Sequence, residues 1–192
     1  MPGIKFFTDL IDALAKVAGG LHAIVNLPKA ERETIRHTLD ETYRLIDTTL
    51  NMVIIRLGDI LLQSVDDDFL REAARLDNYN EWMQVEREFR LCRSLRVALR
   101  ETETLAGKLT GVVSTKDWTA LLQQMHSILA TEGEVALFIG QQFQRQAGAA
   151  RTAGKDGKET QAIRDALTAF RAALVGERQA LIQAEVALFM MV

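Results

Sequence analysis

Proline is almost absent from this chain, and that absence limits the possible folds more than any other feature of the sequence. Both prolines, Pro2 and Pro28, lie near the amino terminus, so residues 29–192 contain none. Proline breaks a helix because it lacks an N–H donor and its ring clashes with the preceding turn. The long proline-free stretch therefore favours uninterrupted helices. No run of alternating apolar and polar residues with turn dipeptides suggests a strand, so we expect an all-α protein.

Apolar residues recur at three- and four-residue steps, the spacing of one helix face, in five long segments. The clearest segment starts at Pro28 and has a seam like that of a coiled coil, formed by Leu39, Tyr43, Ile46, Leu50, Val53, Leu57 and Ile60. Between Met52 and Leu62 most other positions are apolar too, so we expect this half to be buried nearly all round. Residues 66–68, all aspartate, should end the segment and cap a short helix.

The other long segments and their connections give the domain organisation. A third helix is expected from Asn78, a fourth from Ser114 and a fifth after Asp156. Short loops between long helices favour antiparallel neighbours. We predict one domain over 1–192, an antiparallel bundle of four long helices with a short connecting helix. It comprises an amphipathic helix at 1–27, bundle helices within 28–148 and 158–192, and a flexible loop at 149–157.

Composition and motifs exclude several classes of function. A net charge of −3 does not suit nucleic-acid binding by bulk positive charge. None of the histidines, at positions 22, 37 and 126, follows a glutamate by three residues, as the metal sites of helical bundles require. The single cysteine, Cys92, suits a reducing compartment. We expect a cytoplasmic protein without metal or cofactor.

One pair of residues matches a catalytic spacing. Arg32 and His37 are separated by four residues, which resembles the arginine–histidine spacing of HEPN-type ribonucleases. That resemblance implies an all-α fold and metal-independent RNA cleavage by the pair. The alternative interpretation is an exposed histidine on a charged helical turn, and it leaves the chain without a catalytic residue.

Four charged residues interrupt or border the apolar faces and are candidates for a buried polar network. Arg56 lies in the most apolar part of the second helix, Arg96 lies beside the inner face of the third, and Glu132 and Glu177 continue the seams of the fourth and fifth. A buried carboxylate needs a partner, or it takes up a proton. Such residues can form ion pairs that fix helix register, or they can line a polar pocket or a switch.

The first helix has an apolar face that suits either a protein or a membrane surface, formed by Ile4, Phe7, Leu10, Ile11 and Leu14. The layout of an amphipathic helix followed by a helical bundle is similar to the membrane-disrupting domains of cell-death executioners such as the HeLo type, without a shared motif. That similarity implies a regulated membrane-acting bundle.

We interpret the chain first as a non-enzymatic module that works by protein–protein contact, with a protein partner or with a second copy of itself. The alternatives are the membrane-acting bundle and the HEPN-like ribonuclease.

Overall fold

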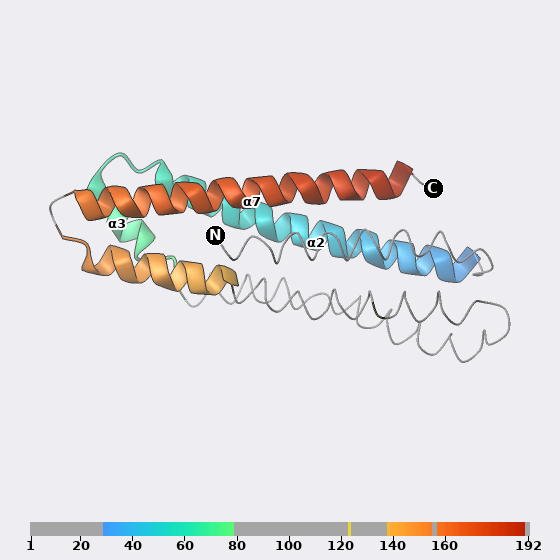
Figure 1. Ribbon diagram of the computed structural model, residues 1–192. Coiled ribbons are helices and arrows are strands. Elements are labelled where there is room, and N and C mark those ends of the chain that lie inside the picture. Colours follow the sequence, from blue (N-terminus) through green and yellow to red (C-terminus); the bar gives the residue numbers. More distant parts are fainter. Residues whose placement is uncertain (1–28, 79–122, 124–137, 155–156, 191–192) are drawn as a thin grey trace.

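The computed structural model describes residues 29–78, 123, 138–154 and 157–190 (Figure 1). Every regular element among them is an α-helix and none is a strand, so the all-α prediction is confirmed. The helix expected at 1–27 and the helices expected to begin at Asn78 and Ser114 fall wholly or mostly outside the described residues.

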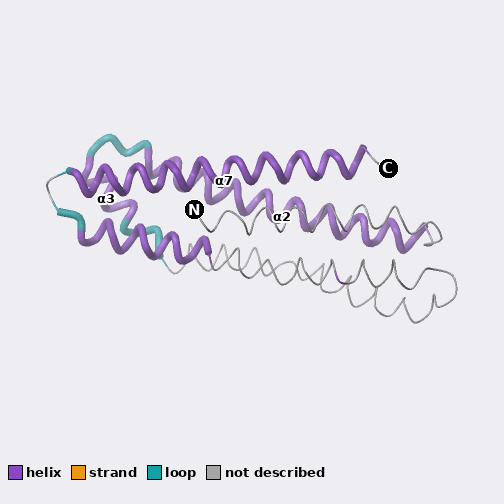
Figure 2. The backbone as a smooth tube through the Cα atoms, in the orientation of Figure 1, coloured by secondary structure: helices purple, strands orange, loops and turns teal. Residues whose placement is uncertain are grey.

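Two long helices form the main axis of the described structure. Helix α2 (Lys29–Leu61) and helix α7 (Lys158–Met190) each contain 33 residues, which makes each about 50 Å long. They run in opposite directions and pack against each other along their lengths (Figures 1 and 2). Neither contains proline, so both continue without a break, as predicted. None of the described helices is both long and apolar enough to cross a membrane.

A short helix, α3 (Asp66–Ala73), follows α2 and packs against it. The expectation that the aspartates cap this helix is corrected: the N-cap is Val65, which has no side-chain capping hydrogen bond. All three aspartates instead occupy the first helical turn. Negative charge is favourable there because the N-terminal end of a helix carries partial positive charge.

A further helical stretch covers 138–152 and precedes α7. The flexible loop expected at 149–157 is therefore shorter than predicted, because four of its residues continue this helix. The Thr152 hydroxyl donates to the Gly148 carbonyl oxygen at 3.2 Å, within the last turn. Gly157, at the start of α7, has a positive φ of 72°, a conformation that glycine adopts without a steric penalty.

The predicted seam of α2 is confirmed in the core. Its six residues from Tyr43 to Ile60 are at most 3% exposed. They face α7, whose buried apolar residues include Ile163, Leu167, Phe170, Leu174 and Leu181. Phe69 and Leu76 close the end of this core near α3, and both are fully buried.

One expectation about α2 is wrong. Its second half is not buried all round, because Ile55 is 53% exposed and Leu62 is 80% exposed. Ile55 lies on the face of α2 opposite the seam, and Leu62 is the first residue after α2, where its N–H still bonds to the Gly58 carbonyl oxygen at 3.0 Å. Val65, just beyond the helix, is 56% exposed. We call Ile55, Leu62 and Val65 the apolar patch.

Candidate functional site

Three arginines of α7 reach across to the first two described helices. Arg164, Arg171 and Arg178 follow one another at intervals of seven residues. Seven residues are close to two helical turns, so the three lie on the same side of α7. We call them the arginine row. Each one bonds to a different group on α2 or α3.

Arg178 makes the most complete contact of the row. Its Nε donates to Asp47 Oδ1 at 2.6 Å, and its Nη2 donates to Asp47 Oδ2 at 3.1 Å. This two-point geometry fixes both the distance and the orientation of the guanidinium and the carboxylate. The hydrogen bonds to Asp47 raise the pKa of Arg178 above its ordinary value. The pair therefore sets the relative position of α2 and α7.

Arg171 bonds to the backbone of α2 rather than to a side chain. Its Nε donates to the carbonyl oxygen of Ile54 at 3.2 Å. In an α-helix that carbonyl also accepts from the N–H four residues later, at Gly58. A Cβ atom at Gly58 would lie 3.3 Å from Arg171 Nε. The glycine thus leaves room for the arginine to lie close against α2.

Arg164 makes its contacts at the start of α3. Its Nη2 donates to Asp66 Oδ1 at 3.1 Å, and its guanidinium carbon lies 3.9 Å from the centre of the Phe69 ring. A cation over an aromatic face gains from the negative potential of the ring. Arg164 therefore attaches α7 to α3 by one charged and one aromatic contact.

The partners on α2 follow the same interval as the arginine row. Ile54 and Asp47 are seven residues apart, and they pair with Arg171 and Arg178, which are also seven apart. Moving seven residues toward the carboxyl end of α7 therefore corresponds to moving seven residues toward the amino end of α2, as expected for two antiparallel helices in a fixed register. One step further, the same register places Glu185 opposite Asp40.

Asp40 and Glu185, which we call the acidic pair, break the pattern because both carry carboxyl groups. Burial raises the pKa of Glu185, the charges of Asp40 and Asp47 raise it further, and Arg44 acts in the opposite direction. Arg44 Nη2 lies 3.0 Å from Asp40 Oδ2. Among the described residues whose charges act on Glu185, two aspartates therefore outweigh one arginine.

Two buried polar atoms at this position, one of them in the acidic pair itself, have no hydrogen bond in the described part of the chain. They are Oδ1 of Asp40 and the hydroxyl oxygen of Tyr43. Tyr43 is fully buried, and burial, with a smaller contribution from Glu185, raises its pKa to about 12. A buried acceptor without a donor costs free energy, so this end of the α2–α7 contact is less well satisfied than the end held by the arginine row.

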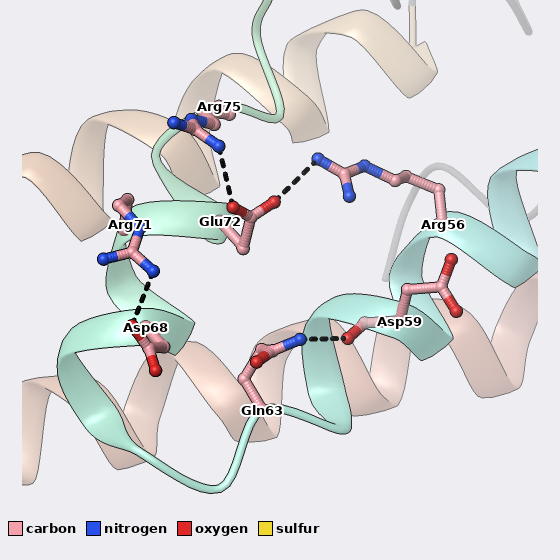
Figure 3. A network of polar contacts seen from close by, with 7 residues as sticks. All are labelled: Arg56, Asp59, Gln63, Asp68, Arg71, Glu72 and Arg75. Carbon is pink, nitrogen blue, oxygen red and sulfur yellow. Dashed lines mark hydrogen bonds and ion pairs between the residues drawn. The ribbon is translucent and has the colours of Figure 1, made fainter.

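A second polar network surrounds α3 (Figure 3). Glu72 lies between two arginines: Arg56 Nη2 of α2 approaches its Oε2 at 3.3 Å, and Arg75 Nη1 approaches its Oε1 at 2.8 Å. Nearby, Arg71 pairs with Asp68 on the surface of α3. The network holds α3 against the most apolar part of α2.

The stretch 138–152 joins the same region through one arginine. Arg151 Nη1 donates to Asp77 Oδ2 at 2.8 Å, and its Nη2 donates to the Ala74 carbonyl oxygen at 2.9 Å and to Asp77 Oδ1. Ala74 follows α3 directly. Arg151 therefore attaches 138–152 to the end of α3 by three hydrogen bonds.

Two of the four residues that the sequence predicted as a buried polar network lie among the described residues. Arg56 pairs with Glu72 of α3, whereas Glu177 lies in α7 with only 9% of its surface exposed. Burial raises the pKa of Glu177. Arg96 and Glu132 lie outside the described residues. The prediction that these four form one network remains a prediction.

The other candidate residues remain predictions as well. Arg32 and His37 both lie in the first part of α2, and His37 is exposed. The apolar face predicted for the first helix lies outside the described residues, namely Ile4, Phe7, Leu10, Ile11 and Leu14.

The sequence patterns considered above did not point to the arginine row or the acidic pair. The signal was present as arginines at intervals of seven in one helix and aspartates at the same interval in another. Only the register between the two helices shows that these residues meet.

Within the described ranges, no group of three or more His, Cys, Asp or Glu side chains could hold a metal ion. The charged residues bond instead to one another and to the backbone across helix contacts, an arrangement that fixes helix register. No protein-family model, curated protein or solved structure shows a significant match to this chain.

Proposed function

We propose that the protein is a non-enzymatic interaction module of the cytoplasm that works by binding protein, in the first instance a second copy of itself. Its full form in this proposal is an antiparallel bundle of four long helices with an amphipathic helix at the amino terminus. The observation that supports the proposal is the apolar patch of Ile55, Leu62 and Val65, whose side chains are 53%, 80% and 56% exposed.

The spacing of the patch suits a helical partner. Ile55 in α2 and Leu62, directly after its last residue, are seven positions apart, the repeat by which coiled-coil helices pack. A two-fold dimer uses the same surface on both subunits. A patch centred on one helix can therefore pack against its own copy, which doubles the apolar area removed from water.

The part of α2 that contains Ile55 and leads to Leu62 and Val65 is held on its other side. The seam of α2 packs against α7, and the contacts of Arg171 and Arg56 fix the same part of α2 to α7 and α3. A surface that is already ordered loses little conformational entropy when it binds. The patch thus combines exposure with a rigid support.

Sedimentation velocity over a range of protein concentrations tests the proposal. We expect the unaltered chain to sediment as a dimer at high micromolar concentration. The double variant Ile55→Glu/Leu62→Glu should sediment as a monomer with an unchanged circular dichroism spectrum, because charge at the patch prevents its burial.

A matched control places the same two charges elsewhere. Thr168 and Gln179 are exposed on α7, so Thr168→Glu/Gln179→Glu should leave the dimer intact. A monomeric unaltered chain at every concentration would refute self-association through this patch, and so would a patch variant that remains a dimer.

A further inference from the structure

The acidic pair lies where the seven-residue repeat of the arginine row, continued along α7, would place another arginine. The arginine row places a guanidinium at every seventh residue of α7 from Arg164 to Arg178, and the next residue in the series is Glu185. Opposite it, Asp40 continues the series of Asp47 and Ile54 on α2. The register therefore places two carboxyl groups at this step, and the charge of Asp40 raises the pKa of Glu185, whereas the preceding steps pair a cation with an acceptor.

The charges of two aspartates and one arginine act on Glu185 among the described residues. On α2 the groups that face Glu185 are Asp40, Tyr43, Arg44 and Asp47, and on α7 its charged neighbour toward the seam is Arg178. Asp47 already binds the guanidinium of Arg178 through both of its oxygens. Arg44 binds one oxygen of Asp40, and the Arg44 side chain is 74% exposed.

The remaining oxygen of Asp40 is the acceptor that a proton on Glu185 would satisfy. Asp40 Oδ1 is buried and has no hydrogen-bond donor among the described residues. A protonated carboxyl group is a donor, whereas an ionised one is an acceptor only. With one proton between them, the two carboxyl groups can bond; with none, they repel each other.

We propose that the acidic pair is a pH-operated latch: one proton held between Asp40 and Glu185 closes the far end of the α2–α7 contact, and loss of that proton lets the end separate. The far end here means the part of the contact beyond Asp47 and Arg178. The near end stays closed at either pH, because the contacts of Arg171 and Arg164 do not need the proton.

The direction of the pH effect follows from the linkage between proton binding by Glu185 and closure of the far end of the α2–α7 contact. In the closed state burial and the two aspartates raise the pKa of Glu185 above its ordinary value. A group whose pKa is raised by a contact stabilises that contact below its ordinary pKa, and the stabilisation is lost as the pH rises through the raised value. The latch therefore closes in acid and opens toward neutral pH.

Distances between paired nitroxide labels, measured by double electron–electron resonance, test the proposal in the full chain with Cys92→Ser. Labels at Glu33→Cys and Gln183→Cys report on the far end, and labels at Ser64→Cys and Lys158→Cys report on the near end; all four positions are exposed. At about pH 4.5 the far pair should give one narrow distance distribution. At about pH 7.5 it should broaden and shift to longer distances, while the near pair stays unchanged.

Two substitutions of one residue separate the latch from a general effect of acid. Glu185→Gln removes the charge and can donate to Asp40, so the far end should be closed at both pH values. Glu185→Arg extends the arginine row by one step, so its guanidinium should pair with Asp40 and also close the far end at neutral pH. Glu177→Gln, which removes a buried carboxyl group elsewhere on α7, should leave the pH response as it is.

An unaltered chain whose far-end distances are the same at both pH values would overturn the proposal. So would a Glu185→Arg variant that is as open at neutral pH as the unaltered chain, since the register would then not place residue 185 opposite Asp40.

Discussion

At the scale of single residues, Gly58 and Arg171 are a matched pair that the contact between α2 and α7 depends on. A glycine inside a helix costs about 1 kcal/mol of stability relative to alanine. At Gly58 the missing side chain lets Arg171 reach the Ile54 carbonyl oxygen, because a Cβ atom would lie 3.3 Å from Arg171 Nε. The helix thus loses intrinsic stability and gains a bond to its neighbour.

The pair gives a prediction in the form of a double-mutant cycle. Gly58→Ala alone should change the free energy of unfolding by less than about 0.5 kcal/mol, since the gain in helix propensity is offset by displacement of Arg171. In an Arg171→Met background the same change should stabilise the protein by about 1 kcal/mol. Urea unfolding of the four proteins measures both values.

Gly176 supplies the control for this cycle. It lies exposed inside α7, and a Cβ atom there would meet nothing within 4 Å. Gly176→Ala should therefore stabilise the protein by about 1 kcal/mol in both backgrounds. Equal effects of Gly58→Ala with and without Arg171 would show that the two residues are not coupled.

At the scale of the helices, the two faces of α2 differ sharply although both are apolar in sequence. Leu57 is fully buried in the seam, and Ile55 is 53% exposed. Leu57→Ala should lower the free energy of unfolding by about 2–5 kcal/mol, since it leaves a cavity. Ile55→Ala should lower it by less than about 1 kcal/mol. Similar losses in a denaturant titration would contradict the assignment of the two faces.

The burial of Leu57 could be predicted from the sequence, whereas the exposure of Ile55 could not. The seam of α2 was predictable because large apolar residues repeat at alternating steps of four and three, and only a helix brings them onto one line. The exposure of Ile55 and Leu62 was not predictable in this way. Periodicity shows which side chains share a face, but it does not show whether another element covers that face.

The attachment of 138–152 to α3 is a second prediction at the level of elements. Arg151→Met removes three hydrogen bonds to Asp77 and Ala74. The Arg151 side chain is 53% exposed, so the loss of global stability should be small, because water screens exposed ion pairs. The local effect should be larger, with faster amide hydrogen exchange in residues 69–78 and unchanged exchange in residues 50–60.

Arg145→Met is the matched control, because Arg145 is exposed on the same helical stretch. It should leave the exchange of residues 69–78 unchanged. Equal protection of that segment in the Arg151 variant and the unaltered protein would show that Arg151 does not hold α3 in place.

At the scale of the whole molecule, charged groups set the register of helices that the apolar seam brings together. The sequence pointed to Arg56 and Glu177 because each interrupts an apolar pattern, and the structure pairs Arg56 with Glu72 of α3 and buries Glu177 within α7. It did not point to Arg178 and Asp47, since each lies on a polar face where charges are ordinary. Pairing across 131 positions of sequence depends on the register of two helices, which a single sequence does not specify.

Glu177 makes the stability of the whole molecule depend on pH. Only 9% of its surface is exposed, and burial raises its pKa. Because the folded protein holds this proton more tightly than the unfolded chain does, the carboxyl group contributes most to stability below its ordinary pKa of about 4.3. That contribution is lost as the pH rises through the raised value, where the buried group must ionise.

We therefore predict that the free energy of unfolding falls as the pH rises from about 5 to about 8, and that Glu177→Gln reduces this fall. The amide has nearly the same shape and never ionises, so the variant should be more stable than the unaltered protein at about pH 8. Urea unfolding at a series of pH values measures the slope. Asp59→Asn, which neutralises an exposed carboxylate of α2, should leave the slope as it is. Parallel profiles for Glu177→Gln and the unaltered protein would mean that Glu177 keeps an ordinary pKa, and that its burial in α7 has no electrostatic cost.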